Sequence, residues 1–222
     1  MSEILEKLAV CVERGKVDKA TPFPPDMNGM EGADELTQQA LEEGVAPDRI
    51  LNDALMVGMK AVGDKFEEGR AFIPDMLISA KAMNAAMNHL QPFLESGAVE
   101  LKGTFILGTV SGDLHDIGKN IVAMVLKGSG WKIVDLGVDV PPEKFLAAIE
   151  EHPGSYVGMS ALLTTTMNQM GKTHAQIKAK YPDTKVFIGG APVSKSFCEE
   201  IGADGYFPDP NKFVKYLETI QA

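Results

Sequence analysis

The alternation of strand and helix patterns in the second half of the chain limits its fold more than any other feature. From residue 104 onward, short runs rich in β-branched and aromatic residues alternate with segments of helical period. The expected strands are 104–110, 132–136, 156–160, 185–188 and 204–207. Repeated strand-then-helix units predict an α/β fold, a parallel sheet with helices on both faces. For these strands we expect the Rossmann-like (flavodoxin-like) order 2-1-3-4-5, with a ligand crevice at the carboxyl ends of the first and third strands.

The first half of the chain shows only helical periodicity and predicts a four-helix bundle. Helices are expected over 2–14 and 33–44, from Pro47 to a break at Gly69, and from Pro74 onward. The last of them carries an apolar stripe made of Met76, Ala80, Met83, Met87 and Leu90. Several prolines and glycines make 20–32 a loop, for which we favour a solvated connector. We therefore expect a helical domain over 1–95, a linker over 96–103 and an α/β domain over 104–222.

Charge and composition exclude several classes of function. The 222 residues include 21 Lys and Arg against 31 Asp and Glu, a net charge of -10, which disfavours nucleic-acid and membrane partners. No basic and apolar leader and no long apolar run is present, so we expect a cytoplasmic protein. Cys11 and Cys198 lie far apart in the sequence and form no metal-binding spacing.

Three loops meet at the predicted crevice. The first, 111–120, holds His115 between Asp113 and Asp116. A neighbouring carboxylate can fix one imidazole nitrogen and present the other outward, so His115 is a candidate ligand or base, although an ordinary loop histidine would show the same pattern. Asp116 is expected to cap the helix that begins near Ile117. The other two loops carry Ser160, Ala161, Leu162 and Thr164, and Gly189, Gly190 and Ala191.

Nucleotide-binding motifs fit this first loop poorly. Five residues separate Gly112 from Gly118 where a P-loop needs four, and Asn120 stands in place of the Mg²⁺-binding hydroxyl. A GxGxxG fingerprint is missing from the sequence. A phosphoacceptor domain would need an acidic pair directly after the first strand, but a differently built, glycine-rich loop follows that strand here.

A resemblance to cobalamin-binding domains accounts for the three loops together. The segments that carry it are 113–118, 160–164 and 189–191, which resemble the DxHxxG, SxL and GG signatures of that family. Segments 112–125 and 133–137 also resemble the cobalamin module of methionine synthase and the small corrinoid proteins of anaerobic methyltransferase systems. Residues between 58 and 80 resemble the helical cap of the same proteins, so the resemblance extends from about residue 33 to the end of the chain.

The resemblance implies a role for each matching residue. His115 would be the lower axial ligand of cobalt, Asp113 would accept its other ring N–H, and Ser160 would continue this relay. Phe72, Met76 and Met83 would cover the upper axial face, although methionines at such helical spacing more often fill a core. The cofactor-binding set implied in the α/β domain is Gly112, Asp113, Leu114, His115, Asp116, Ile117, Gly118, Ser160, Leu162, Thr164, Gly189, Gly190 and Ala191. The glycines would leave room for the cofactor's displaced nucleotide tail.

The implied function is that of a corrinoid methyl carrier. Co(I) would accept a methyl group from a substrate-specific methyltransferase, and methyl-Co(III) would deliver it to a second methyltransferase that uses tetrahydrofolate or coenzyme M. A reductive activator protein would be a third partner. The chain would be non-catalytic alone, because its two domains leave no room for a donor-binding barrel. O-demethylation, methylamine demethylation and betaine demethylation are all compatible with the sequence, and its general appearance favours an aryl ether or a betaine.

Two other cobalamin proteins are alternatives. A cobalamin-sensing regulator would need an output surface, usually a basic DNA-binding element, which a net charge of -10 does not suggest. A radical-mutase module shares the histidine motif but normally accompanies a large catalytic barrel.

Overall fold

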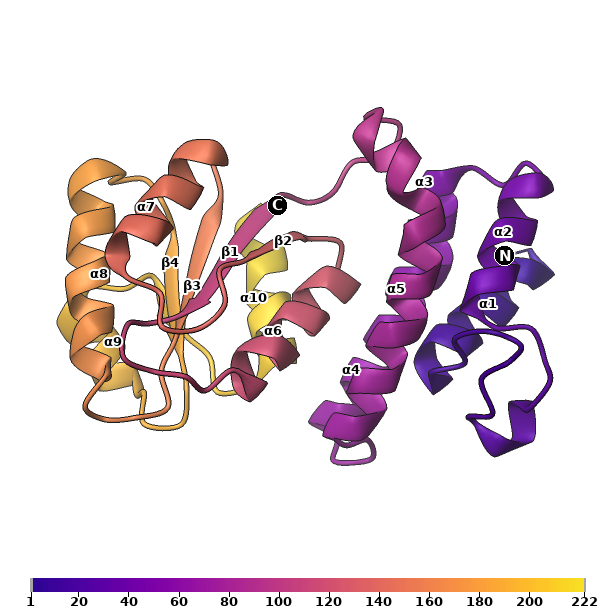
Figure 1. The fold of residues 1–222 in the computed structure, drawn as a ribbon, viewed down its shortest axis with the longest axis horizontal. Helices are drawn as coiled ribbons and strands as arrows, with labels where there is room; N and C mark the ends of the chain where they lie inside the picture. Colours follow the sequence, from indigo (N-terminus) through magenta and orange to yellow (C-terminus); the bar gives the residue numbers. More distant parts are fainter. Residues whose placement is uncertain (1, 222) are drawn as a thin grey trace. The chain divides into compact units, whose positions relative to one another are not determined.

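The chain forms two compact units, an N-terminal one of residues up to 101, with which residues 127–130 are grouped, and a C-terminal one of the other residues from 102 onward (Figure 1). The structure is a computed structural model that describes residues 2–221. The division falls inside the segment expected to be the linker. Within the described residues, every helix is too short or too polar to cross a membrane.

The N-terminal unit is a bundle of helices, as the periodicity predicts. Its elements are α1 (Glu3–Arg14), α2 (Ala33–Glu42), α3 (Pro47–Ile50), the π turn η2 (Leu51–Leu55), α4 (Met56–Glu67) and α5 (Ile73–Glu95). The region predicted as the third helix therefore consists of α3, the π turn η2 and α4, which follow one another without a gap. Prolines at the first turns of α3 and α5 start these helices, because a first-turn N–H needs no helical partner.

The connector between α1 and α2 is largely exposed, as we expected, but it is attached to the bundle at two points. It contains a 3-10 turn, Pro25–Met27, and buries the Met27 side chain. Arg14 of α1 makes two hydrogen bonds of 2.7 Å to the Asp26 carboxylate. An apolar anchor and a bidentate ion pair therefore fix a segment whose composition alone indicates only a loop.

The C-terminal unit is a five-stranded parallel sheet in the predicted order, β2-β1-β3-β4-β5. Its strands are β1 (Thr104–Thr109), β2 (Lys132–Asp135), β3 (Tyr156–Ser160), β4 (Val186–Gly189) and β5 (Gly205–Tyr206). Its helices are α6 (Ile117–Gly128), α7 (Pro142–Glu151), α8 (Met167–Lys180), α9 (Lys195–Ile201) and α10 (Pro210–Gln221). The last strand is shorter than expected, and Pro208, which has no N–H to donate to a ladder, follows closely.

Helices cover both faces of the sheet (Figure 1). Alternate residues of β1 point to opposite faces, with Ile106 packed against α7 and α8, and Phe105 and Leu107 packed against α6 and α10. An apolar core on each face therefore stabilises the sheet, and the loops extend from the ends of its strands.

Candidate functional site

The loops after β1, β3 and β4 come together at one edge of the sheet because these strands are neighbours. Thr109 pairs with Ser160, and Ser160 pairs with Gly189, so all three strands end at the same level. The backbone of Gly190, at φ +131°, passes so close to the second loop that a Cβ there would lie 1.8 Å from the carbonyl oxygen of Ala161. Glycine at this position is therefore required by the contact between the two loops.

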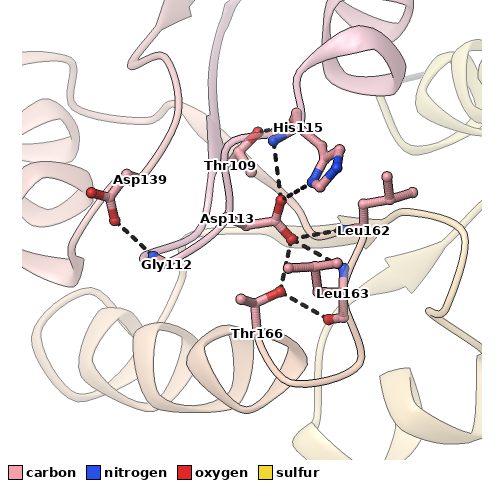
Figure 2. A network of polar contacts seen from close by, with 8 residues as sticks. All are labelled: Thr109, Gly112, Asp113, His115, Asp139, Leu162, Leu163 and Thr166. Carbon is pink, nitrogen blue, oxygen red and sulfur yellow. Dashed lines mark hydrogen bonds and ion pairs between the residues drawn. The ribbon is translucent and has the colours of Figure 1, made fainter.

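The centre of the site is an imidazole held by a buried carboxylate (Figure 2). His115 Nδ1 lies 2.8 Å from Asp113 Oδ1, and the same oxygen accepts the His115 backbone N–H at 3.1 Å. A carboxylate can only accept here, so Nδ1 carries a proton, and Nε2 is the ring nitrogen that remains for a ligand. The side chain of His115 is 51% exposed while that of Asp113 is fully buried. This arrangement presents an oriented nitrogen ligand at the surface.

The second carboxylate oxygen of Asp113 ties the first loop to the one after β3. Oδ2 accepts the N–H groups of Leu162 at 2.8 Å and Leu163 at 3.1 Å, and the Thr166 hydroxyl at 2.7 Å (Figure 2). Burial by itself raises the pKa of Asp113, but the hydrogen bonds from Thr166, Leu162 and His115 outweigh it, so the net pKa lies well below the ordinary value. Asp113 therefore remains an anion.

We expected the Ser160 hydroxyl to continue the relay from His115 and Asp113, but Thr166 makes this contact instead. The hydroxyl that contacts Asp113 belongs to Thr166, just before α8, whose Oγ1 also lies 2.8 Å from the carbonyl oxygen of Leu163. Ser160 is the last residue of β3, and its backbone carbonyl accepts the N–H of Val110. The chain turns between them and brings the buried Thr166 over the carboxylate. The run of three threonines, 164–166, was the available signal, but sequence alone does not show which of them turns inward.

Two further contacts that the sequence did not reveal support the histidine loop. Thr109, at the end of β1, donates its hydroxyl to the His115 carbonyl oxygen at 2.9 Å. Asp139, in the loop after β2, accepts the Gly112 N–H at 2.7 Å and donates its own N–H to the Asp113 carbonyl oxygen at 2.9 Å. Asp139 lies outside the loops after the first, third and fourth strands, to which the sequence motifs are confined.

The helix start is formed differently from the expected cap. Asp116 directly precedes α6, and its backbone carbonyl accepts the Asn120 N–H. Its carboxylate accepts the side-chain amide of Asn120 at 3.0 Å, whereas we expected it to accept first-turn N–H groups.

Exposed apolar side chains surround the histidine. Leu114 is 71% exposed and Ile117 is 69% exposed, and Leu162 and Leu163 are also exposed. At Gly118 and Gly189 an added Cβ would meet nothing within 4 Å, so there is open space beside the backbone. Thr164 and Ala191 lie at the surface of the second and third loops. Apolar surface of this kind beside an oriented ligand fits a large and partly apolar cofactor.

The remaining predicted residues belong to α5 and the residue before it. Phe72 is 66% exposed, and Met76 and Met83 are buried. Their proposed place over the upper axial face stays a prediction.

Fold and site together define an α/β protein that presents one carboxylate-bound histidine at the carboxyl edge of its sheet, and the chain also contains a separate helical unit. Residues 103–213 and residues 30–91 each match a family model described as a B12 binding domain.

Three relatives cover most of the chain. Trimethylamine corrinoid protein 1 of Methanosarcina acetivorans is 39% identical over 207 residues, which are 91% of this chain and 94% of the relative. Monomethylamine corrinoid protein 2 of the same organism is 43% identical over 179 residues, 78% of this chain and 82% of the relative. In the methanol:cobalamin methyltransferase complex MtaBC of Methanosarcina barkeri, the matching chain is 31% identical with a TM-score of 0.83 over 99% of this chain and 80% of that one.

The chain belongs to the family of cobalamin-binding corrinoid proteins of methyltransferase systems. It is a corrinoid methyl carrier with a helical unit and a Rossmann-like B12 domain.

The residues present fit cobalamin. His115 Nε2 would be available as a nitrogen ligand for its cobalt. The exposed leucines and Ile117 would offer apolar contact to the macrocycle, and the open space at Gly118 and Gly189 would leave room for a nucleotide tail.

Proposed function

We propose that this carrier holds cobalamin with His115 as the lower axial ligand and serves a methyltransferase for N-methyl donors. The observation that carries the proposal is the pairing of a half-exposed imidazole with a fully buried carboxylate 2.8 Å away. Such a partner fixes the tautomer and the orientation of a metal-binding histidine.

The protein groups have distinct tasks in this proposal. Bound cobalamin supplies the metal centre that accepts and gives up the methyl group. Asp113 keeps His115 Nε2 directed outward, and the three donors on its other oxygen keep the carboxylate in place. His115 Nε2 would be the nitrogen that holds the metal. Asp113, which its lowered pKa keeps ionised, would stabilise positive charge on the imidazole whenever Nε2 carries a proton instead.

Relatives named for methylamines support the choice of donor. The trimethylamine and monomethylamine corrinoid proteins are 39% and 43% identical to this chain, against 31% for the matched chain of the methanol complex. They favour an N-methyl donor over the aryl ether or betaine favoured at first. We propose three partners: a substrate-specific methyltransferase, a second methyltransferase that passes the methyl group to tetrahydrofolate or coenzyme M, and a reductive activator.

Axial ligation can be tested by electron paramagnetic resonance of the protein loaded with cob(II)alamin. A single axial nitrogen splits the cobalt lines into triplets, and ¹⁵N-histidine in the protein should convert them to doublets. His115→Gln should abolish the isotope effect, and His152→Gln, at the end of α7, should preserve it. Triplets that persist in the ¹⁵N-labelled wild type would mean that the cofactor's own base binds cobalt, which would refute the proposal.

The donor is tested by mixing the loaded, reduced protein with candidate methyltransferases and following methylation by absorbance. We expect methylation with methylamine enzymes and none with the donor alone. Methylation by a methoxyaryl or betaine enzyme alone would refute the donor assignment and leave axial ligation standing.

A further inference from the structure

The end of β2 and the loop after it support both flanks of the histidine loop, although they lie outside the three loops that carry the family motifs. Asp139 of this loop bonds to the segment before His115, and Asp135, the last residue of β2, bonds through α6 to the residue after it. All of these groups belong to the C-terminal unit.

On the N-terminal flank, Asp139 bonds two successive residues. Its carboxylate accepts the N–H of Gly112 at 2.7 Å, and its N–H donates to the carbonyl oxygen of Asp113 at 2.9 Å. Asp139 has a φ of +52°, the only positive φ of a non-glycine residue within residues 2–221. The left-handed conformation of a non-glycine residue costs about 1 kcal/mol or more and persists only where surrounding contacts impose it. Asp139 therefore fixes the main chain from which the Asp113 side chain projects (Figure 2).

On the C-terminal flank, a chain of polar contacts leads from Asp135 to Asp116. Lys119 is 4% exposed, and its Nζ lies 2.7 and 2.6 Å from the two carboxylate oxygens of Asp135. The same Nζ donates to Asn120 Oδ1 at 2.8 Å, and the Asn120 amide donates to the Asp116 carboxylate at 3.0 Å. A buried ammonium with a bidentate partner is held in one place. It anchors the first turn of α6, and Asp116 directly follows the histidine.

We propose that Asp139 and the Asp135–Lys119 pair are positioning residues that set the direction of His115 from both sides. This inference rests on the proposed axial role of His115. The groups touch neither the imidazole nor its carboxylate, so they act through the backbone on each side. An axial bond is sensitive to such support, because a ligand displaced by a fraction of an ångström loses orbital overlap with the metal.

A role limited to folding would have different consequences. It would lower the stability of the protein and the amount of cofactor retained, but it would leave the histidine-bound fraction of the retained cofactor unchanged. The measured quantity is therefore the histidine-bound fraction of cob(II)alamin in protein labelled with ¹⁵N-histidine.

The principal variant is Asp139→Gly. Glycine adopts the left-handed conformation freely, so the substitution removes the carboxylate contact without adding backbone strain. We expect at least a threefold loss in the ratio of histidine-bound to histidine-free cofactor, and a more positive Co(II)/Co(I) potential, because an axial ligand favours the oxidised state. Asp139→Asn keeps an oxygen acceptor and should restore most of the ratio. Asp183→Gly, which changes an exposed turn, is the matched control. Lys119→Met should reproduce the loss from the other flank.

Nitrogen NMR of the cofactor-free protein gives a second measurement that does not depend on cofactor retention. In the wild type His115 should be fixed with its proton on Nδ1, and in Asp139→Gly and Lys119→Met it should exchange between tautomers. Variants that retain both the wild-type ratio and the wild-type tautomer would overturn the inference while leaving axial ligation intact. A wild-type spectrum without protein nitrogen would instead overturn the proposed function and this inference with it.

Discussion

At the scale of single residues, one buried carboxylate organises the site. Asp113 accepts two hydrogen bonds from His115 on one oxygen and three from residues 162–166 on the other. Charge-assisted bonds of this kind are stronger than neutral ones, and together they compensate for the burial of the charge. The same five contacts fix the imidazole and join two loops that are about fifty residues apart in sequence.

The first prediction concerns Asp113→Asn. An amide cannot accept all of these donors, so unfolding free energy at pH 7 should fall by about 2 kcal/mol. The folded-state pKa of Asp113 lies below that of the unfolded chain, so its contribution is complete above about pH 4 and declines as the pH falls further. Urea unfolding of cofactor-free wild type and variant at pH 7, 5 and 3.5 measures this. The gap between them should narrow only at the lowest pH, and a gap that widens there would contradict the assignment. Asp183→Asn is the control.

The second prediction concerns Gly118→Ala in the first turn of α6. A Cβ there meets nothing within 4 Å, and alanine is favoured over glycine in a helix by up to about 1 kcal/mol. The cofactor-free variant should therefore be at least as stable as wild type. Because the methyl group would occupy space proposed for the nucleotide tail, cobalamin affinity should fall at least tenfold. Thermal unfolding and equilibrium titration with cobalamin separate the two effects, and undiminished affinity would exclude Gly118 from the tail site.

At the scale of elements, the sheet sets the position of the loops, and its cores hold the sheet. Phe105 of β1 is fully buried, with its ring centroid 5.8 Å from that of Trp131, 6.0 Å from Phe187 and 5.6 Å from Phe213. These rings come from the sheet, the segment before β2 and α10. Edge and stacked contacts of this kind stabilise a core beyond simple burial of area.

The third prediction follows from this cluster. Phe105→Ala should lower the unfolding free energy by about 3–5 kcal/mol, because it removes a buried ring and leaves a cavity. The only tryptophan of the chain, Trp131, lies in the same cluster and reports unfolding by fluorescence. Phe23→Ala, which changes a 41% exposed ring in the N-terminal unit, should alter stability by less than about 0.5 kcal/mol and serves as the control. A small effect of Phe105→Ala would mean that the cluster contributes little to the sheet.

At the scale of the whole molecule, the negative charge is distributed unevenly. Residues 1–101 contain 18 acidic and 9 basic residues, and residues 102–222 contain 13 and 12. The N-terminal unit thus carries nearly all of the net charge of -10. A large charge of one sign raises the rate of encounter with a surface of the opposite sign, and salt weakens the effect.

The fourth prediction is that docking to the methyltransferase depends on salt. If a basic surface of the enzyme meets the N-terminal unit, the second-order rate of methyl transfer should fall severalfold between about 50 and 300 mM salt, as the Debye length shortens. Stopped-flow absorbance measures this rate. The rate at low salt should fall in the double variant Glu42→Lys, Glu43→Lys of the N-terminal unit, whereas the rate at high salt should not change. The matched double variant of the C-terminal unit, Glu199→Lys, Glu200→Lys, should change the rate less. A rate that rises with salt would contradict the prediction.

The sequence by itself determined the class of fold and the identity of the ligand candidate. Strand runs separated by helical segments predict a parallel sheet with crossover helices. The order 2-1-3-4-5 was the expectation for five such strands, and this order brings the three loops together. A carboxylate bound to His115 was predictable because aspartates close by in the same loop can bond locally, and the choice of Asp113 came from the family resemblance. The chemical meaning of this pairing came from a resemblance to a family.

Only the tertiary structure decided which groups surround that pair. Thr166 replaces Ser160 as the hydroxyl on Asp113 because the turn after β3 carries the chain back over the carboxylate. Asp139, from the loop after β2, contacts the histidine loop directly, and Asp135, at the end of β2, supports it through Lys119 of α6; no local pattern encodes either contact. Local bonds depend on spacing along the chain and can be read from sequence. Contacts between loops depend on where distant strands end, so they are fixed only when the sheet has formed.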